Sequence, residues 1–215
     1  MNFDAIIFDM DGLLVDSETV WFIAEKEMIE SRGHAYTDEV REQIIGLRVD
    51  EFLSKLHAIY QLEDSVIALY HELSERMLAL IPKFVKPQPG AVELVEYVAA
   101  NNIPHAIASS SPMSIIDVII ESQGWGDIFT VRCSADDEKA GKPAPDVYLA
   151  AARRLGVEPS RCLALEDSPN GSRAAVAAGM TCYAVPDTSH SSPDKFADIT
   201  PHVFTDLHAV LASLK

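Results

Sequence analysis

The chain has 215 residues, enough for one large domain or for a domain with a substantial insertion. Its formal charge of −16 argues against nucleic acid or an anionic membrane as a partner, because no basic patch is present to neutralise phosphates. No apolar run approaches the roughly 20 residues needed to cross a bilayer, and no signal peptide is evident at the N-terminus. We therefore expect a soluble, cytoplasmic monomer whose three cysteines stay reduced.

The first predicted element is a short strand that ends in acidic residues. Residues 5–8 are wholly apolar, the pattern of a strand buried on both faces of a parallel sheet. Asp9 and Asp11 follow at once, and Gly12 lets the chain turn away. In open α/β sheets the ligand crevice lies outside the carboxyl ends of the strands. Two acids at that position favour a divalent cation and phosphate chemistry, although a loop with two solvated acids is the simpler alternative.

The next 65 or so residues are predicted to be helical, with no convincing strand. Ser17 is a plausible N-cap of the first helix, which ends near Gly33. Three further helices are expected at 37–46, 49–60 and 64–80. A connection that contains Pro82, Pro87, Pro89 and Gly90 then marks a boundary.

After Gly90 the pattern alternates between strands and helices. Strands are predicted at 105–108, near 129–131, and at 162–165, 181–185 and 202–204, with helices at 91–100, 113–122, 145–155 and 169–178. This alternation is typical of βαβ units and a parallel sheet. We therefore predict an α/β fold, a doubly wound parallel sheet formed by residues 1–15 and 85–215. Residues 16–84 would be an α-helical cap domain inserted after the first strand.

Polar residues stand at three further positions on the predicted sheet edge. Ser109 ends one apolar strand, Glu166 and Asp167 end another, and Lys142 lies in a loop before a helix. Because parallel strands share one carboxyl edge, we expect these residues to converge on Asp9. Singly, Ser109 could be a helix cap, Lys142 a solvated lysine, and the two acids ordinary helix-start residues.

Each residue type suits one part of a phosphoryl transfer. Asp9 can attack phosphorus and leave as a mixed anhydride, and Asp11 can act in turn as general acid and general base. Ser109 can hydrogen-bond phosphate oxygens, and Lys142 can neutralise charge on the transferred group.

The acids at the two strand ends also provide ligands for a cation. Mg²⁺ prefers oxygen ligands and keeps several waters. Asp9, Asp167, Glu166 and a backbone carbonyl near Asp11 could hold it.

Four motifs resemble the signatures of the haloacid dehalogenase superfamily, in order and over the whole chain. They are D-M-D-G-L-L-V-D-S-E, I-A-S-S-S, G-K-P-A-P-D and L-E-D-S-P-N-G. The subgroup resembled is the β-phosphoglucomutase-like phosphatases with a helical cap. Residues 47–50 and 185–186 look similar to bacterial phosphatases acting on 2-deoxyglucose 6-phosphate and hexitol phosphates. The resemblance implies that Asp9 is the nucleophile and that Asp11 is the general acid and base and also a metal ligand through its carbonyl. It implies that the phosphate is bound by Ser109, Ser110 and Lys142. Glu166 and Asp167 would complete the metal shell.

Departures from related families narrow the expected reaction. Dehalogenases and phosphonatases lack the second aspartate, which is present here as Asp11. β-Phosphoglucomutase has a cap histidine where this chain has Trp21. We expect Mg²⁺-dependent hydrolysis of a small phosphomonoester, a sugar or sugar-alcohol phosphate, through a phosphoaspartyl intermediate. The alternatives are a β-phosphoglucomutase-type phosphosugar mutase and a non-enzymatic phosphate-binding protein.

Overall fold

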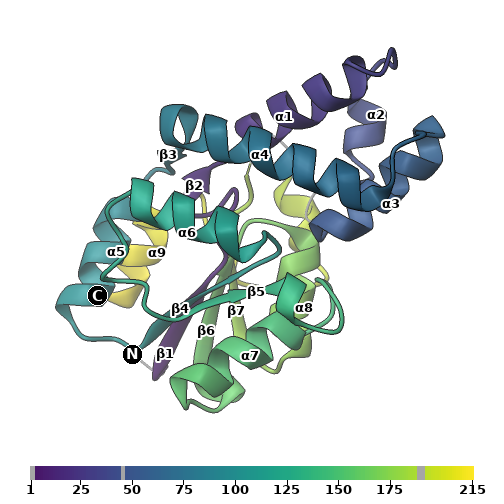
Figure 1. Ribbon diagram of the computed structural model, residues 1–215. Coiled ribbons are helices and arrows are strands. Elements are labelled where there is room, and N and C mark those ends of the chain that lie inside the picture. The colour runs from purple at the N-terminus through teal and green to yellow at the C-terminus, as the bar shows by residue number, and fades with distance from the viewer. Residues whose placement is uncertain (1–2, 45–46, 188–191) are drawn as a thin grey trace.

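The computed structural model describes residues 3–44, 47–187 and 192–215. Its centre is a five-stranded parallel sheet with the strand order β5-β4-β1-β6-β7 (Figure 1). The middle strand, β1, is paired with β4 on one side and with β6 on the other. The strand bounds are β1 Ala5–Phe8, β4 His105–Ser109, β5 Arg132–Ser134, β6 Cys162–Glu166 and β7 Thr181–Ala184.

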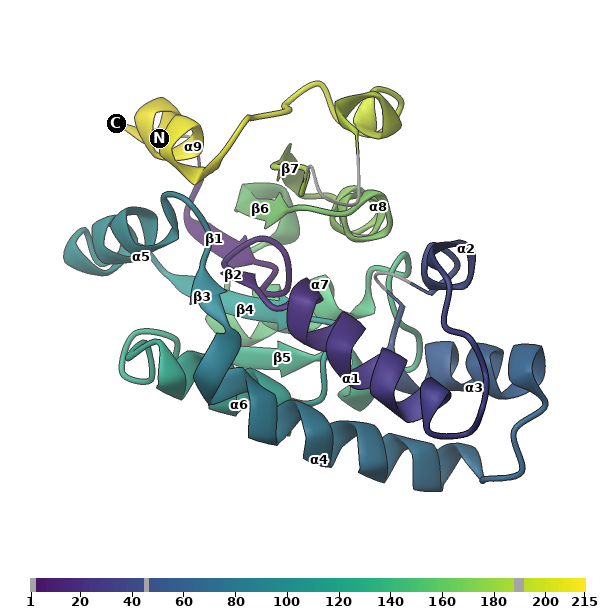
Figure 2. The same ribbon diagram turned by 90° about the horizontal axis from the view of Figure 1, so that it is seen from above.

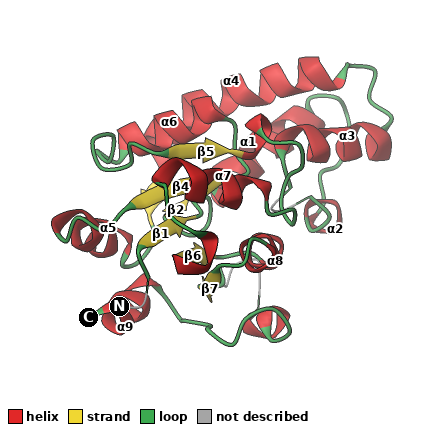
Figure 3. Cartoon of the chain, turned by 90° about the horizontal axis from the view of Figure 1, so that it is seen from below, coloured by secondary structure: helices red, strands yellow, loops and turns green. Residues whose placement is uncertain are grey.

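Alternate residues of β1 point to opposite faces of the sheet, and each face has its own layer of helices. Ile6 and Phe8 share an apolar cluster with residues of α5, α6 and α9, whereas Ala5 and Ile7 share another with α7 and α8. Helices flank the strands on both sides in Figure 3. Their bounds are α5 Ala91–Ala100, α6 Met113–Ser122, α7 Asp146–Leu155, α8 Pro169–Ala177 and α9 Leu207–Leu214, with short 3-10 turns η1 Ala135–Asp137, η2 Pro159–Arg161 and η3 Pro193–Phe196. This layering confirms the predicted doubly wound α/β fold.

Between β1 and α5 the chain forms the helices α1 to α4, which lie together beyond one end of the sheet (Figures 1 and 2). The longest, α4, packs against α1 and α3 and also against α6. The chain leaves and returns through a short antiparallel pair of strands, β2 and β3. The bounds are β2 Val15–Asp16, α1 Glu18–Glu30, α2 Asp38–Arg41, α3 Val49–Tyr60, α4 Val66–Phe84 and β3 Lys86–Pro87. The inserted helices are present as expected, and their limits as a separate cap domain, 16–84, stay a prediction.

Two predicted strands differ from the observed structure. The strand expected near 129–131 begins at Arg132, because the amides of Phe129 and Thr130 donate to the nearby carbonyls of Trp125 and Ile128 in a turn. Residues 202–204 form no strand; Val203 makes a single bridge to Ala184. At the first place Phe129 is a core residue outside the sheet, whereas at the second Val203 is exposed and makes only the one bridge.

Three helical predictions also need correction. The helix expected at 37–46 is an α-helix only over Asp38–Arg41, and residues 45 and 46 lie outside the described residues. Helix α4 continues through Pro82, which was placed in the connection, and ends at Phe84. Helix α9 was not predicted at all. In the part of the chain that the structure describes, no helix is long and apolar enough to cross a membrane.

Candidate active site

The residues predicted at the strand ends do come together. Asp9 directly follows β1, and Glu166 ends the neighbouring strand β6, with Phe8 in register with Leu165. Lys142 reaches them from the loop before α7, although it is separated from Asp9 by 133 positions. Its Nζ atom donates to Asp9 Oδ1 at 2.5 Å, to Glu166 Oε1 at 2.7 Å and to the Ala108 carbonyl at 3.0 Å. Lys142 is therefore a buried link between two strand ends and not a solvated lysine.

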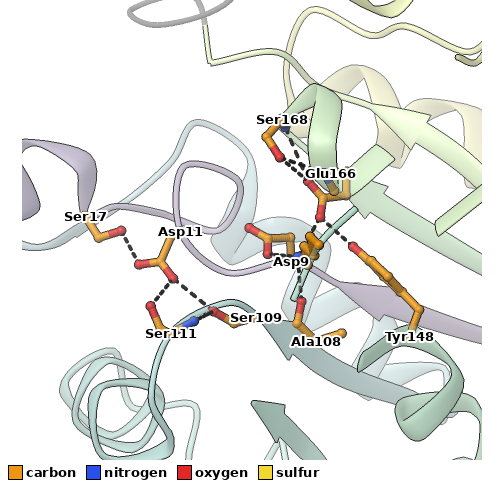
Figure 4. A network of polar contacts seen from close by, with 11 residues as sticks. Asp9, Asp11, Ser17, Ala108, Ser109, Ser111, Tyr148, Glu166 and Ser168 are labelled. Carbon is orange, nitrogen blue, oxygen red and sulfur yellow. Dashed lines mark hydrogen bonds and ion pairs between the residues drawn. The ribbon is translucent and has the colours of Figure 1, made fainter. Parts of the chain in front are cut away.

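Glu166 is held at both of its carboxylate oxygens. Oε1 accepts hydrogen bonds from Lys142 and from the Tyr148 hydroxyl at 2.7 Å. Oε2 accepts from the Ser168 amide at 3.3 Å and from the Ser168 hydroxyl at 3.1 Å, as Figure 4 shows. Gly171 lies so close that an added Cβ would stand 1.8 Å from Oε1, so any larger residue would displace the carboxylate. The sequence here fixes Glu166 in one position.

The cluster carries more buried negative charge than Lys142 can balance. Burial raises the pKa of Asp9 well above its usual range; Lys142 opposes this rise, whereas Glu166 and Asp11 add to it. Burial also raises the pKa of Asp167, with Asp9 as the next cause. Burial alone would lower the pKa of Lys142, but Asp9 and Glu166 overcome that effect and raise it. Lys142 therefore stays protonated, and its single positive charge does not balance the carboxylates around it, so a further cation would stabilise the site.

A divalent cation would supply this missing positive charge. Asp9, Glu166 and Asp167 are all buried, and each offers a ligand atom within 4.8 Å of the others. Gly12 has φ +81° and passes so near that an added Cβ would lie 2.3 Å from Asp167 Oδ2. A bare backbone therefore leaves room beside that carboxylate. Three carboxylates with one lysine fit a hard cation with oxygen ligands such as Mg²⁺.

Asp11 lies beside the cluster but has different neighbours. Its Oδ1 accepts from the Ser17 hydroxyl at 2.6 Å and the Trp21 indole at 3.2 Å. Its Oδ2 accepts from the hydroxyls of Ser109 at 3.0 Å and Ser111 at 2.8 Å (Figure 4). Ser17 stands at the N-cap position of α1 without a capping bond, so its hydroxyl serves Asp11 and not the helix. Hydrogen-bond donors from the core and from the start of α1 thus hold the Asp11 carboxylate in one position.

Two adjoining pockets meet at Asp11. The catalytic pocket is lined by Asp9, Asp11, Glu18, Ser110, Lys142, Asp167 and Ser168. The cap pocket shares Asp11, Glu18 and Ser110 and extends to Trp21, Glu25, Arg41, Phe52 and other residues of the inserted helices. Of the predicted phosphate ligands, Ser110 and Lys142 line the catalytic pocket. Ser109 is buried behind them and donates its hydroxyl to Asp11.

Several residues of the site were missed from the sequence. Glu18, Glu25 and Arg41 line the cap pocket, and Ser111 and Tyr148 hold the two key carboxylates. Glu18 ends the first motif and Ser111 ends the second, so their place in those motifs is a signal in the sequence. Tyr148 and Arg41 lie inside helices, where nothing local distinguishes them from surface or core residues.

Comparison with known proteins identifies a family for this chain. The model of the family described as haloacid dehalogenase-like hydrolase matches residues 6–185, most of the chain. The chain belongs to the haloacid dehalogenase-like hydrolases.

Relatives of this hydrolase carry phosphatase names. It is 34% identical to a probable pseudouridine-5′-phosphatase of Drosophila melanogaster, over 92% of each chain. It is 33% identical to hexitol phosphatase B of Escherichia coli, over 95% of this chain and 94% of that one. The structure of CbbY from Rhodobacter sphaeroides in complex with xylulose-(1,5)-bisphosphate superimposes with a TM-score of 0.85, at 26% identity and over 95% of each chain.

Proposed function

We propose that this hydrolase removes the phosphoryl group from small phosphomonoesters, sugar or sugar-alcohol phosphates, with Mg²⁺ as its cofactor. The observation that carries the proposal is that Asp9, Lys142 and Asp167 line one pocket together, with Asp9 and Lys142 buried and in contact with each other. The names of the relatives, a pseudouridine-5′-phosphatase and a hexitol phosphatase, support a phosphate ester of a small polyhydroxylated alcohol.

In the first step, a carboxylate oxygen of Asp9 attacks phosphorus. The bond between phosphorus and the alcohol oxygen breaks, and Asp11 donates a proton to that oxygen. The products are the free alcohol and an aspartyl phosphate on Asp9. The four donors around Asp11 hold its carboxyl group at the entrance to the cap pocket, where the leaving alcohol would stand.

In the second step, water attacks the phosphorus of the aspartyl phosphate. Asp11 now lacks its proton and takes one from the water. The bond between phosphorus and the Asp9 oxygen breaks, which releases inorganic phosphate and restores the Asp9 carboxylate.

Charge on the phosphoryl group is balanced from two sources. Lys142 lies at 2.5 Å from Asp9 Oδ1, so its ammonium is close to the attacking carboxylate and to the group that it receives. Mg²⁺, when bound by Asp9, Asp167 and the Asp11 carbonyl with Glu166 completing the shell, supplies further charge neutralisation. Ser110, which lines the catalytic pocket, is the proposed hydroxyl ligand of the phosphate. The role predicted for Ser109 would require its buried hydroxyl to exchange Asp11 for the phosphate.

The mutase alternative has less support. A mutase must return the phosphoryl group to a second sugar hydroxyl and exclude water. Trp21, which stands where β-phosphoglucomutase has its cap histidine, binds Asp11 through its indole and offers no imidazole for proton transfer. Water is therefore the proposed acceptor.

Replacing the nucleophile tests the proposal. Asp9→Asn should lower phosphate release from sorbitol 6-phosphate and p-nitrophenyl phosphate by about 10³-fold or more, and no phosphoenzyme should form. The protein should still fold, because the neutral amide removes a charge that is costly to bury and Lys142 keeps its contact with Glu166. Steady-state kinetics measures phosphate release, acid-quench labelling detects the phosphoenzyme, and a melting curve tests folding.

A suitable control is Asp16→Asn, the same change at an exposed position seven residues away. It should leave activity within about twofold of the unmodified enzyme, as expected for surface substitutions. Retention of more than about one per cent of the activity by Asp9→Asn would overturn the covalent role.

A further inference from the structure

The cap pocket adjoins the catalytic pocket on the side where a leaving alcohol would lie. Glu18 and Asp11 line both pockets, so a group that extends from a phosphate near Asp9 into the cap pocket passes these two acids. Trp21 and Phe52 form an apolar wall, with ring centroids 6.1 Å apart and the planes nearly perpendicular. The cap pocket is therefore where the alcohol part of a bound phosphomonoester would lie.

When its two glutamates are ionised, the cap pocket carries mostly negative charge. Among the described residues that line it, three are acidic, Asp11, Glu18 and Glu25, and one is basic, Arg41. Arg41 is paired with Glu18: its Nη2 atom donates to Glu18 Oε2 at 2.9 Å and to the Glu18 carbonyl, also at 2.9 Å. The guanidinium group is therefore already engaged by an anion from this chain.

Glu25 adds a second carboxylate that is held in place. Its Oε2 accepts a hydrogen bond from the Tyr36 hydroxyl at 2.5 Å, and its side chain is buried. An anionic group entering this pocket would lose its water and gain carboxylates as neighbours, which is doubly unfavourable. Uncharged hydroxyl groups would instead donate hydrogen bonds to these same oxygens.

We propose that the cap pocket selects phosphomonoesters whose alcohol is uncharged and polyhydroxylated, and rejects those that carry a second phosphate or a carboxylate. This inference rests on the proposed phosphatase function. It separates the chain from its structural neighbour CbbY, which was captured with a bisphosphate. Glu18 and Glu25 are the residues that determine this specificity, the first by pairing with Arg41 and the second by its own charge.

Matched substrates test the inference directly. Sorbitol 6-phosphate and 6-phosphogluconate differ only at the far carbon, which bears a hydroxyl in one and a carboxylate in the other. Glycerol 3-phosphate and 3-phosphoglycerate form a second such pair. We expect kcat/KM to be about 100-fold higher for the uncharged member of each pair. For compounds that turn over slowly, kcat/KM is obtained from competition against p-nitrophenyl phosphate.

The assay pH matters because the glutamates must be ionised. Burial raises the pKa of Glu18 to about 8 and that of Glu25 to about 7. The groups that face them are Asp11, Tyr36, Arg41 and, at longer range from the loop after β7, Asp187. The comparison is therefore made at pH 9.

One variant isolates the charge of Glu25. Glu25→Gln keeps an oxygen that can accept from Tyr36 but removes the negative charge. The ratio of kcat/KM for sorbitol 6-phosphate to that for 6-phosphogluconate should fall by about fivefold or more. Glu75→Gln, on the exposed side of α4, changes the net charge equally and should leave the ratio unchanged.

Each result has a definite meaning. Equal kcat/KM values within both pairs, or preference for the charged members, would overturn the inference even if Glu25→Gln failed to fold. A ratio that Glu25→Gln does not move would show that the glutamate charge is not the cause. Absence of phosphate release from every compound, p-nitrophenyl phosphate included, would instead overturn the proposed phosphatase function.

Discussion

Glu166 and Asp167 are adjacent carboxylates, yet the structure gives them different surroundings. Both oxygens of Glu166 accept hydrogen bonds, from Lys142, Tyr148 and Ser168. Asp167 lines the catalytic pocket next to the bare backbone of Gly12. Asp167 is thus better placed as a direct ligand of the proposed metal, and Glu166 as a support for Lys142 and for the ligand shell.

This difference predicts unequal effects of neutralising the two acids. Asp167→Asn should raise the Mg²⁺ concentration for half-maximal activity by about 100-fold, and Glu166→Gln by about tenfold. Chelation should abolish activity, and added Mg²⁺ should restore it. Mg²⁺ titrations of phosphate release, with Mn²⁺ binding followed by calorimetry, make the measurement. Equal losses in the two variants would mean that the assignment is wrong.

Single residues were predictable where a short pattern fixes the backbone. An apolar strand that stops at an acid places Asp9, Glu166 and Asp167 at one edge without any knowledge of their partners. Tyr148 could not be found in this way, because its hydroxyl meets Glu166 only after helix and sheet have packed. The pairing of Glu18 with Arg41 could not be predicted either, because the two residues are separated by 23 positions in the chain.

Helix α9 is an element whose sequence carries enough information to predict it. Leu207, Val210, Leu211 and Leu214 repeat at helical spacing and are all buried, and α9 packs against α5. Asp206 accepts a hydrogen bond from the Ala209 amide at 2.8 Å, a side-chain N-cap. Both features are visible in the sequence and indicate a helix at 207–214. The β2–β3 pair is a different case, because a two-residue strand has no periodicity and forms only when residues about 70 positions apart meet.

The N-cap of α9 supplies a stability prediction. Asp206→Ala leaves one amide at the start of the helix without its side-chain acceptor, and should lower the free energy of unfolding by about 1 kcal/mol. Urea denaturation followed by circular dichroism measures it. Asp198→Ala, at an exposed position outside the regular helices, is the control and should change stability by less than about 0.5 kcal/mol. If the two variants lost equal stability, the cap would contribute nothing of its own.

The molecule as a whole is joined by one apolar cluster that crosses from the sheet into the inserted helices. Phe8 and Ile107 of the sheet, Ile116 of α6 and Leu73 and Met77 of α4 all belong to it. Helix α4 is the bridge, because it packs on α1 and α3 on one side and on α6 on the other. A shared core of this kind favours unfolding of both parts together.

The two tryptophans report on this cooperativity from opposite parts of the chain. Trp21 lies in α1, and Trp125 lies just after α6; both are buried. In Trp21→Phe the fluorescence comes from Trp125, and in Trp125→Phe it comes from Trp21. Within each variant, the fluorescence midpoint should agree with the midpoint from circular dichroism to within about 2 °C. An earlier fluorescence transition in Trp125→Phe alone would show that the inserted helices unfold independently.

The central position of β1 has a consequence for how the chain is made. Of the five strands of this sheet it is the first to leave the ribosome, but its neighbours β4 and β6 follow about 100 and 155 residues later. At roughly 5–20 residues per second, the second neighbour arrives about 8–30 s after β1 itself. During that interval the apolar segment Ala5–Phe8 has no strand on at least one edge, which exposes it to pairing with other chains. Helices α1 to α4 are synthesised in the same interval and are built from local contacts, so they can form while β1 waits for its partners.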